Sequence, residues 1–163
     1  MNNVAPDLAP DYYLNNFRFL LDWVQERYAD LLNVEEQHFV QQFYQLDHDA
    51  QCLLVRLSSR KGPLFRRDKL RYREIASLDM AAQQLLGAEL LQTATPIDLE
   101  LLCHSLTKPE LLLLFGEQLA GLKQARKEVL IQNITNQFTE PRSWQDWTNN
   151  QLGAAWYLDN QRI

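Results

Sequence analysis

Apolar residues recur at helical spacing through the first third of the chain. From Tyr12 onward they return every three or four positions, which places them on one face of a helix that Asp11 is suited to cap. Asn33 has the character of a second helix start, and a third helix is expected over residues 49–61. The apolar positions at this spacing are Leu14, Phe17, Leu21, Val24 and Tyr28, then Phe39, Phe43 and Leu46 on one face, and then Leu53, Leu54 and Leu57, which are expected to point inward.

The pattern becomes less regular after the third helix. Gly62-Pro63 ends that helix, because proline restricts the residue before it and cannot extend a helix. Residues 64–75 are expected to form a short strand or a loop, followed by a helix around residues 78–86 that Gly87 terminates. Residues 90–93 could form another brief strand.

Three helices followed by short extended segments predict a mainly α fold with a winged-helix-like portion. We expect this helical unit over residues 12–93, after a loose leader over residues 1–11 that contains two prolines. Residues 93–96 form the best internal boundary. Beyond this boundary, the pattern predicts helices over residues 97–105, 109–119 and 125–138, with a loop over residues 120–124.

Two features mark the second half. Thr107 and Glu110 form a capping-box pattern, in which hydroxyl and carboxylate each satisfy a backbone donor at a helix start. Three of the four tryptophans then fall within residues 139–163, which we expect to be a tail. Rings of that size need a surface to pack on. The tail is therefore interpreted either as the start of a linker in a longer protein or as a homodimer contact.

Charge is distributed very unevenly along the chain. The net charge of the whole chain is −5. Residues 56–73 contain eight of the sixteen basic residues and one acid, Asp68, so this stretch carries +7 and the remainder carries −12. Such clustering is costly without an anionic partner or a bordering acidic surface. The basic residues of the stretch are Arg56, Arg60, Lys61, Arg66, Arg67, Lys69, Arg71 and Arg73.

Arg56, Arg60 and Lys61 are the first candidates for binding nucleic acid. Arg56 and Arg60 are four residues apart, so on a helix they project from one face, and Lys61 is adjacent. Guanidinium forks and an ammonium group are suited to successive phosphates. Two of these cations could instead offset the negative end of the helix dipole. The further charges of the stretch favour contact with DNA, because a dipole needs only one or two cations. They are Arg66, Arg67, Lys69, Arg71 and Arg73.

Other candidates are aromatic or lie further along the chain. Tyr12 and Tyr72 could bind phosphates or stack on bases, although tyrosines at such positions are often packing residues. A second basic group, Lys123, Arg126 and Lys127, lies at a loop-to-helix junction, where backbone N–H groups attract phosphate. The alternative for this group is a solvated surface.

Motifs for catalysis, metal binding and membrane insertion are not found in the sequence. Nucleases of the restriction-endonuclease type need an Asp and a Glu-x-Lys element, and no Glu here is followed two residues later by Lys. Cys52 and Cys103 lack a CxxC partner, so both are expected to be reduced and partly buried. Apolar runs are too short to span a bilayer and no signal peptide is visible, which predicts a cytosolic protein without membrane contact.

Four segments of the sequence resemble the Fanconi-associated nucleases. The order and spacing match the part of those proteins that precedes the nuclease domain, and the resemblance covers roughly residues 12–138. The segments are Tyr12-Tyr13-Leu14-Asn15-Asn16-Phe17, Phe43-Tyr44-Gln45-Leu46, Val55-Arg56-Leu57-Ser58-Ser59-Arg60-Lys61-Gly62-Pro63-Leu64-Phe65-Arg66 and Lys69-Leu70-Arg71-Tyr72.

This resemblance carries implications that the residues alone do not. It implies that residues 97–138 are a SAP-like helix–loop–helix unit that binds DNA, although the basic loop over residues 121–127 matches only loosely. The family members cleave branched DNA, prefer 5′ flaps and act in interstrand crosslink repair. Positions that contact DNA in the family correspond here to Tyr12, Arg56, Arg60, Lys61 and Tyr72.

The resemblance also implies a longer, bacterial parent protein. Its metal centre, for Mg²⁺ or Mn²⁺, would lie in a downstream VRR-NUC nuclease domain, so we expect no cofactor in this chain. The partners implied are flap or branched DNA and that downstream domain, and the location is the cytoplasm at the nucleoid. Two other hypotheses remain: a module whose basic face docks an acidic protein, and an enzyme with an unrecognised site.

Overall fold

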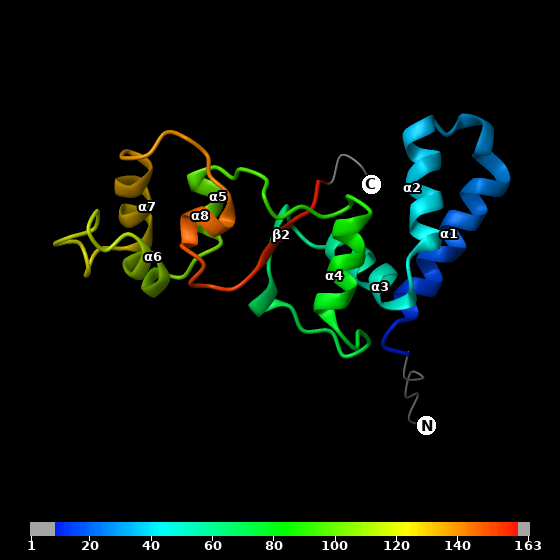
Figure 1. Cartoon of the computed structure of the whole chain (residues 1–163), viewed down its shortest axis with the longest axis horizontal. Coiled ribbons are helices and arrows are strands. Elements are labelled where there is room, and N and C mark those ends of the chain that lie inside the picture. The colour runs from blue at the N-terminus through cyan, green and yellow to red at the C-terminus, as the bar shows by residue number, and fades with distance from the viewer. Residues whose placement is uncertain (1–8, 160–163) are drawn as a thin grey trace, which may run out of the picture. The chain divides into compact units, whose positions relative to one another are not determined.

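The structure is a computed structural model that describes residues 9–159. It is mainly helical, which confirms the predicted fold class (Figure 1). The predicted leader and the predicted tail lie partly outside the described residues. Two compact units are present: the first contains residues 9–63, 71–91 and 158–159, and the second contains residues 64–70 and 92–157.

The first unit begins with two helices that run side by side as a hairpin (Figure 1). Their faces meet through aromatic residues, and the ring of Phe17 contacts that of Phe43 edge-on at 5.0 Å between centroids. Two further helices complete the unit. Its elements are α1 (Tyr12–Tyr28), η1 (Ala29–Leu31), α2 (Val34–Gln45), α3 (His48–Ser58) and α4 (Leu78–Gly87).

Capping explains most of the helix starts in this unit. Asn33 forms a capping box with Glu36, as expected for a second helix start, because each side chain satisfies a backbone N–H. Asp11 occupies the N-cap position of α1, but its side chain makes no capping bond and pairs with His48 instead. The prediction that the Asp11 side chain caps the helix is therefore wrong.

The third helix ends earlier than predicted. α3 stops at Ser58, three residues before Lys61. The hydroxyl of Ser59 donates to the carbonyls of Val55 and Arg56, both at 3.0 Å, and so satisfies the carbonyl of Arg56 at the end of the helix. Arg60 and Lys61 consequently follow the helix in a turn.

The second unit combines four short helices with a small sheet. The Thr107 capping box forms as predicted and starts one of the helices. The helices are shorter than the sequence pattern predicted, and the one within the predicted tail was not foreseen. The elements are β1 (Leu64–Arg66), η2 (Arg67–Lys69), α5 (Leu99–His104), α6 (Lys108–Leu114), α7 (Lys127–Thr135), α8 (Trp144–Thr148) and β2 (Ala155–Tyr157).

The sheet of the second unit is a single antiparallel pair. β1 pairs with β2 in a register that places Phe65 opposite Trp156 and Arg66 opposite Ala155. The brief strand expected over residues 90–93 is present only as an isolated bridge between Gln92 and Tyr157. The pairing brings the beginning and the end of the second unit together.

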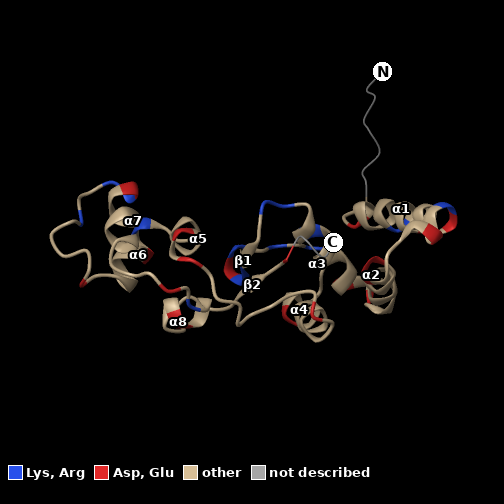
Figure 2. Ribbon diagram, turned by 90° about the horizontal axis from the view of Figure 1, so that it is seen from above, with Lys and Arg blue, Asp and Glu red and all other residues tan. Residues whose placement is uncertain are grey.

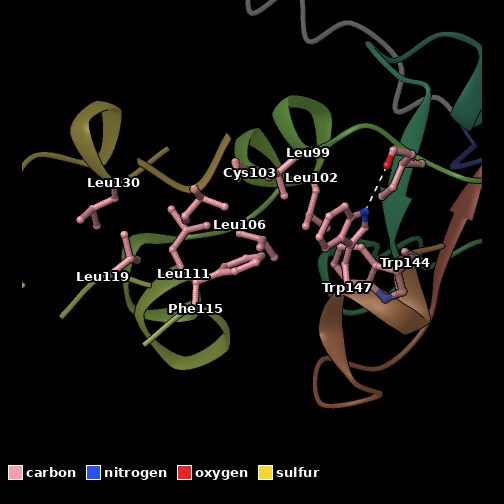
Figure 3. Packing of buried hydrophobic residues seen from close by; sticks show 13 residues of the cluster. Leu99, Leu102, Cys103, Leu106, Leu111, Phe115, Leu119, Leu130, Trp144 and Trp147 are labelled. Carbon is pink, nitrogen blue, oxygen red and sulfur yellow. Dashed lines mark hydrogen bonds between the residues drawn. The ribbon is translucent and has the colours of Figure 1, made fainter. Parts of the chain in front are cut away.

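The tryptophans pack inside the second unit. Trp144 and Trp147 are buried against leucines of α5 and α6, and Figure 3 shows both indoles within this cluster. The Nε1 atom of Trp147 donates to the carbonyl of Ile97 at 3.1 Å, and that of Trp144 donates to the carbonyl of Gly153 at 2.8 Å. Trp156 is also buried. These rings find partners within the chain, so the homodimer prediction loses the reason given for it.

Candidate nucleic-acid interface

The end of α3 meets the segment that leads to α4 in the first unit. Arg56, near the end of α3, forms an ion pair with Glu74, with 2.7 Å between Nε and Oε1. The same carboxylate oxygen accepts a hydrogen bond from the hydroxyl of Tyr13 at 2.7 Å. The Glu74 side chain is only 4% exposed, whereas that of Arg56 is 35% exposed. A buried carboxylate thus lies beneath a partly exposed guanidinium.

Aromatic rings hold the guanidinium of Arg56. Its Cζ atom lies 4.2 Å from the ring centroid of Tyr13 and 5.0 Å from that of Tyr72. The hydroxyl of Tyr72 in turn accepts a hydrogen bond from Nη1 of Arg60 at 3.0 Å. Stacking of a cation on ring faces is favourable and fixes its plane. Contacts therefore connect Tyr13, Arg56, Tyr72 and Arg60 into one group.

The electrostatics of this group follow from the shared carboxylate. Burial alone would raise the pKa of Glu74, but hydrogen bonds from Tyr13 and Arg56 outweigh it and hold that pKa below its usual value. Burial is the largest single influence on Arg56 and opposes its charge, but the hydrogen bonds to Glu74 and Tyr13 and the charge of Glu74 together outweigh it and raise the pKa of Arg56. Burial, together with bonds to Cys52 and Glu74, raises the pKa of Tyr13. Glu74 and Arg56 are therefore both charged at neutral pH, and Tyr13 keeps its proton.

The structure brings together most of the residues that resemblance implied for DNA contact. Tyr12 is exposed, and its ring contacts that of Tyr13 edge-on at 6.2 Å, which extends the group to Arg56, Tyr72 and Arg60. Lys61 follows Arg60 and is exposed, as are Arg71 and Arg73 on either side of Tyr72. We name this set, with Tyr13 and Glu74, the α3 basic cluster. In Figure 2, basic stretches lie beside α3.

Two members of the α3 basic cluster were missed from the sequence. Tyr13 is adjacent to the predicted Tyr12, and nothing in the apolar pattern distinguishes its role. Glu74 is the first acid after the basic stretch. An acid directly bordering a run of cations is the kind of compensating group that the charge argument requires, so its position was a usable signal.

Arg66 has a different environment, in the second unit. Its side chain is 5% exposed and its two terminal nitrogens donate to the two oxygens of Glu110, both at 2.7 Å. It also bonds the carboxylate of Asp68 and the carbonyl of Ser105. The guanidinium lies 5.6 Å from the ring centroid of Trp144. We therefore assign Arg66 to the packing of this unit rather than to a surface that grips phosphate.

The remaining basic residues of the stretch belong to η2. Arg67 is half-buried, and its backbone N–H donates to the carbonyl of Ala154 at 2.9 Å. Lys69 is exposed. The stretch over residues 56–73 is thus divided between the two units. The prediction that all eight cations form one exposed surface is wrong for Arg66, which is buried and paired with Glu110 and Asp68. For the other seven it stays a prediction.

The second basic group predicted from the sequence lies just before α7 and at its first residue. Lys123 and Arg126 are exposed, and Lys127 is the half-buried first residue of the helix. Arg126 occupies the N-cap position without a capping bond from its side chain. Figure 2 shows these cations along the loop that enters α7. Contact of this group with DNA stays a prediction.

Metal ligands and membrane helices were also sought among the described residues. Within residues 9–159, no three His, Cys, Asp or Glu side chains gather in a way that could hold a metal ion. The same part of the chain has no helix long and apolar enough to cross a membrane. Cys52 and Cys103 are both free and fully buried, so they lie deeper than the partly buried positions expected from the sequence.

Family models match both halves of the chain. The model described as FAN1, HTH domain matches residues 11–92. The model described as Fanconi anemia-associated nuclease SAP domain matches residues 96–147. The second match continues past residue 138, where we expected the SAP-like unit to end, and includes α8. The fold is therefore an HTH domain followed by a SAP domain.

Relatives and solved structures agree with these models. The Fanconi-associated nuclease 1 homolog of Pseudomonas aeruginosa is 41% identical over 138 residues, which is 85% of this chain and 24% of that protein. Fanconi-associated nuclease 1 of Ailuropoda melanoleuca is 34% identical over 148 residues, or 88% of this chain and 14% of that protein. The chain thus spans a quarter or less of the length of these curated relatives.

A structural match extends over nearly the whole chain. A crystal structure of paFAN1 bound to 2nt 5′ flap DNA with gap superposes with a TM-score of 0.88 at 39% identity. It covers 94% of this chain and 28% of the paFAN1 chain. Models, relatives and structure agree, and the chain belongs to the Fanconi-associated nuclease family.

Proposed function

We propose that this chain is the DNA-binding region of a structure-specific nuclease and that it holds the duplex beside a 5′ flap. The observation that carries the proposal is the match of 94% of the chain to paFAN1 in a complex with 5′ flap DNA. The α3 basic cluster supplies suitable chemistry on the first unit. Exposed Arg60, Lys61 and Arg71 present cations for phosphates, and Tyr12 presents an exposed ring.

Binding by this surface is expected to be independent of DNA sequence. Phosphate contacts fix the position of a protein on a duplex but carry no information about bases. Arginine and lysine contacts release counterions, so affinity falls as salt rises. A nuclease that selects a junction gains more from the shape of the DNA than from its sequence.

Cleavage belongs to the longer parent in this proposal. We infer a parent that is a 5′ flap endonuclease and 5′ exonuclease in interstrand crosslink repair, with Mg²⁺ or Mn²⁺ in a VRR-NUC domain beyond this chain. It would act in the bacterial cytoplasm at the nucleoid. The role of this chain is to hold the junction while that domain acts.

A titration followed by fluorescence anisotropy tests the proposal. Labelled 5′ flap DNA and plain duplex, each in two unrelated sequences, are titrated with the purified chain at low and moderate salt. We expect binding that weakens with salt and has equal affinity for the two sequences. Polyglutamate serves as an anionic control, and binding of polyglutamate as tight as binding of DNA would favour a module that docks acidic proteins.

Two results would overturn the proposal. One is the absence of any DNA binding at low salt. The other is cleavage of flap DNA by the chain itself after addition of Mg²⁺ or Mn²⁺, because the chain would then contain a catalytic centre that we assign elsewhere.

A further inference from the structure

A buried carboxylate lies beneath the most basic part of the first unit. Glu74 follows Arg71 and Arg73 in the sequence, yet its side chain is 4% exposed. Its Oε1 accepts two hydrogen bonds, from Arg56 and from Tyr13, both at 2.7 Å. Burying a carboxylate is costly unless it is paired and hydrogen-bonded, and here both conditions are met. The carboxylate is therefore built into the fold directly beside the cations, where it is fully paired.

The contacts of Glu74 reach further than its two direct partners. The guanidinium of Arg56 lies between the rings of Tyr13 and Tyr72, at 4.2 and 5.0 Å. Tyr72 also accepts the hydrogen bond of Arg60 at 3.0 Å. Glu74 bonds both Nε of Arg56 and the hydroxyl of Tyr13, so it restrains the guanidinium and one of the two rings that the guanidinium contacts.

We propose that Glu74 is a positioning residue that, together with Tyr13, holds Arg56 in its DNA-binding orientation before DNA arrives. The inference rests on the proposed function and adds to it the reason why the side chain of Arg56 is already oriented in the free chain. Free arginine side chains lose much rotamer freedom when they become ordered. A side chain that is ordered in advance avoids this loss at the moment of binding.

A competing account gives Glu74 the opposite effect. If Glu74 only neutralised Arg56, its removal would free a cation for phosphate. Affinity for DNA would then rise, and the salt dependence would steepen by up to about 0.9 in the slope of log K against log salt. The two accounts therefore predict changes of opposite sign.

Two substitutions at Glu74 separate geometry from charge. Glu74→Ala and Glu74→Gln remove the same negative charge, but only Gln keeps an oxygen that can accept from Tyr13 and Arg56. Positioning predicts that Glu74→Ala weakens flap binding about three- to tenfold, since ordering one long side chain costs about that factor. Glu74→Gln should fall between this variant and the unchanged chain. The exposed Glu26 provides a matched control, and Glu26→Ala should not weaken binding.

A double substitution tests whether Glu74 acts through Arg56. Arg56→Lys keeps the charge but loses the Nε donor and the planar group between the rings. In the Arg56→Lys chain, Glu74→Ala should cost little further affinity. A loss that arises through contacts of Glu74 other than Arg56 would persist there at full size, so this coupling shows whether Glu74 acts through Arg56. The unfolding midpoints of the single and double variants report general destabilisation separately.

If a Glu74 variant folds poorly, a milder substitution still tests the inference. Tyr13→Phe removes one hydrogen bond of Glu74 and keeps the ring, and positioning predicts a smaller loss of affinity than that of Glu74→Ala. Titrations are run well below the unfolding midpoint of each variant, measured by circular dichroism.

The outcomes separate this inference from the proposed function. Binding by Glu74→Ala as tight as, or tighter than, that of the unchanged chain would overturn the inference while the proposed function stands. If Glu74→Ala weakened flap binding as much in the Arg56→Lys chain as in the unchanged chain, the inference would also be overturned while the proposed function stands. Absence of DNA binding by the unchanged chain would overturn both.

Discussion

Replacement of Arg66 by methionine should destabilise the second unit without a direct loss of phosphate contacts. Methionine fills a similar volume but cannot donate to Glu110, Asp68 or the carbonyl of Ser105. The change leaves the Glu110 carboxylate, whose side chain is 19% exposed, without its bidentate partner. Removing one member of a largely buried ion pair is strongly destabilising, because the other charge stays desolvated.

The pKa of Glu110 gives the size of this effect. Hydrogen bonds from Arg66 are the largest cause that lowers the pKa of Glu110 from 4.5 to about 2. A difference of that size corresponds to on the order of 3 kcal/mol. This agrees with the roughly 3–5 kcal/mol found when buried ion pairs are broken. We expect about 3 kcal/mol, or a fall in the melting temperature of about 6–12 °C for a chain of this length.

The effect should also depend on pH. The pKa of Glu110 is lower in the folded chain, so its contribution to stability is complete above about pH 4.5 and is lost as the pH falls toward 2. The cost of Arg66→Met should therefore be about half as large at about pH 3 as at neutral pH.

Urea unfolding followed by tryptophan fluorescence measures these quantities. Trp144, Trp147 and Trp156 all lie in the second unit, so the signal reports mainly on that unit. Lys69→Met is the matched control, because it removes an exposed cation and should stay within about 0.5 kcal/mol of the unchanged chain. A loss below about 1 kcal/mol for Arg66→Met, equal at both pH values, would refute the reasoning.

Three further predictions concern stability. Thr107→Ala removes the hydroxyl of a capping box and should cost about 1 kcal/mol in urea unfolding; an unchanged midpoint would contradict the cap. Trp147→Ala leaves a cavity in a well-packed cluster and should cost about 3–5 kcal/mol in the same assay; a cost below about 1 kcal/mol would mean that the ring is not packed as described. Hydrogen bonds from Asp11 and Asp49 raise the pKa of His48, so its stabilising contribution is complete below about pH 6.5 and is lost as the pH rises through the raised pKa. His48→Gln should therefore lower the melting temperature at about pH 5.5 but not at about pH 9, and an equal effect at both would refute this.

Local signals in the sequence predicted the helices better than they predicted their ends. The spacing from Tyr12 to Tyr28 and the capping box at Thr107 gave elements that the structure confirms. Both depend on neighbours within a few residues, which sequence alone specifies. α3 ends at Ser58, before the predicted Lys61, and the backbone N–H of Arg60 then bonds the carbonyl of Leu57, three residues back. Apolar spacing does not predict this change.

Long-range contacts decide which cations are exposed for phosphate binding, and the sequence did not predict these contacts. Arg66 and Arg60 look alike within the basic stretch, but Arg66 meets Glu110, which is 44 residues away. Arg56 meets Glu74 at a separation of 18 residues. The composition indicates that acidic residues must offset the positive charge of the basic stretch. Only the fold shows which arginines pair with those acids. The same limit applies to the segment expected as a tail, because Trp147 in that segment bonds the carbonyl of Ile97, which is 50 residues earlier.

The most direct test of DNA binding by the α3 basic cluster is the salt dependence of flap affinity for the chain with Arg60→Ala and Lys61→Ala together. Both residues are exposed, so folding should be unaffected. If each contacts one phosphate, the slope of log K against log salt should become shallower by about 1.8, and affinity at low salt should fall. An unchanged slope with unchanged affinity would contradict the account.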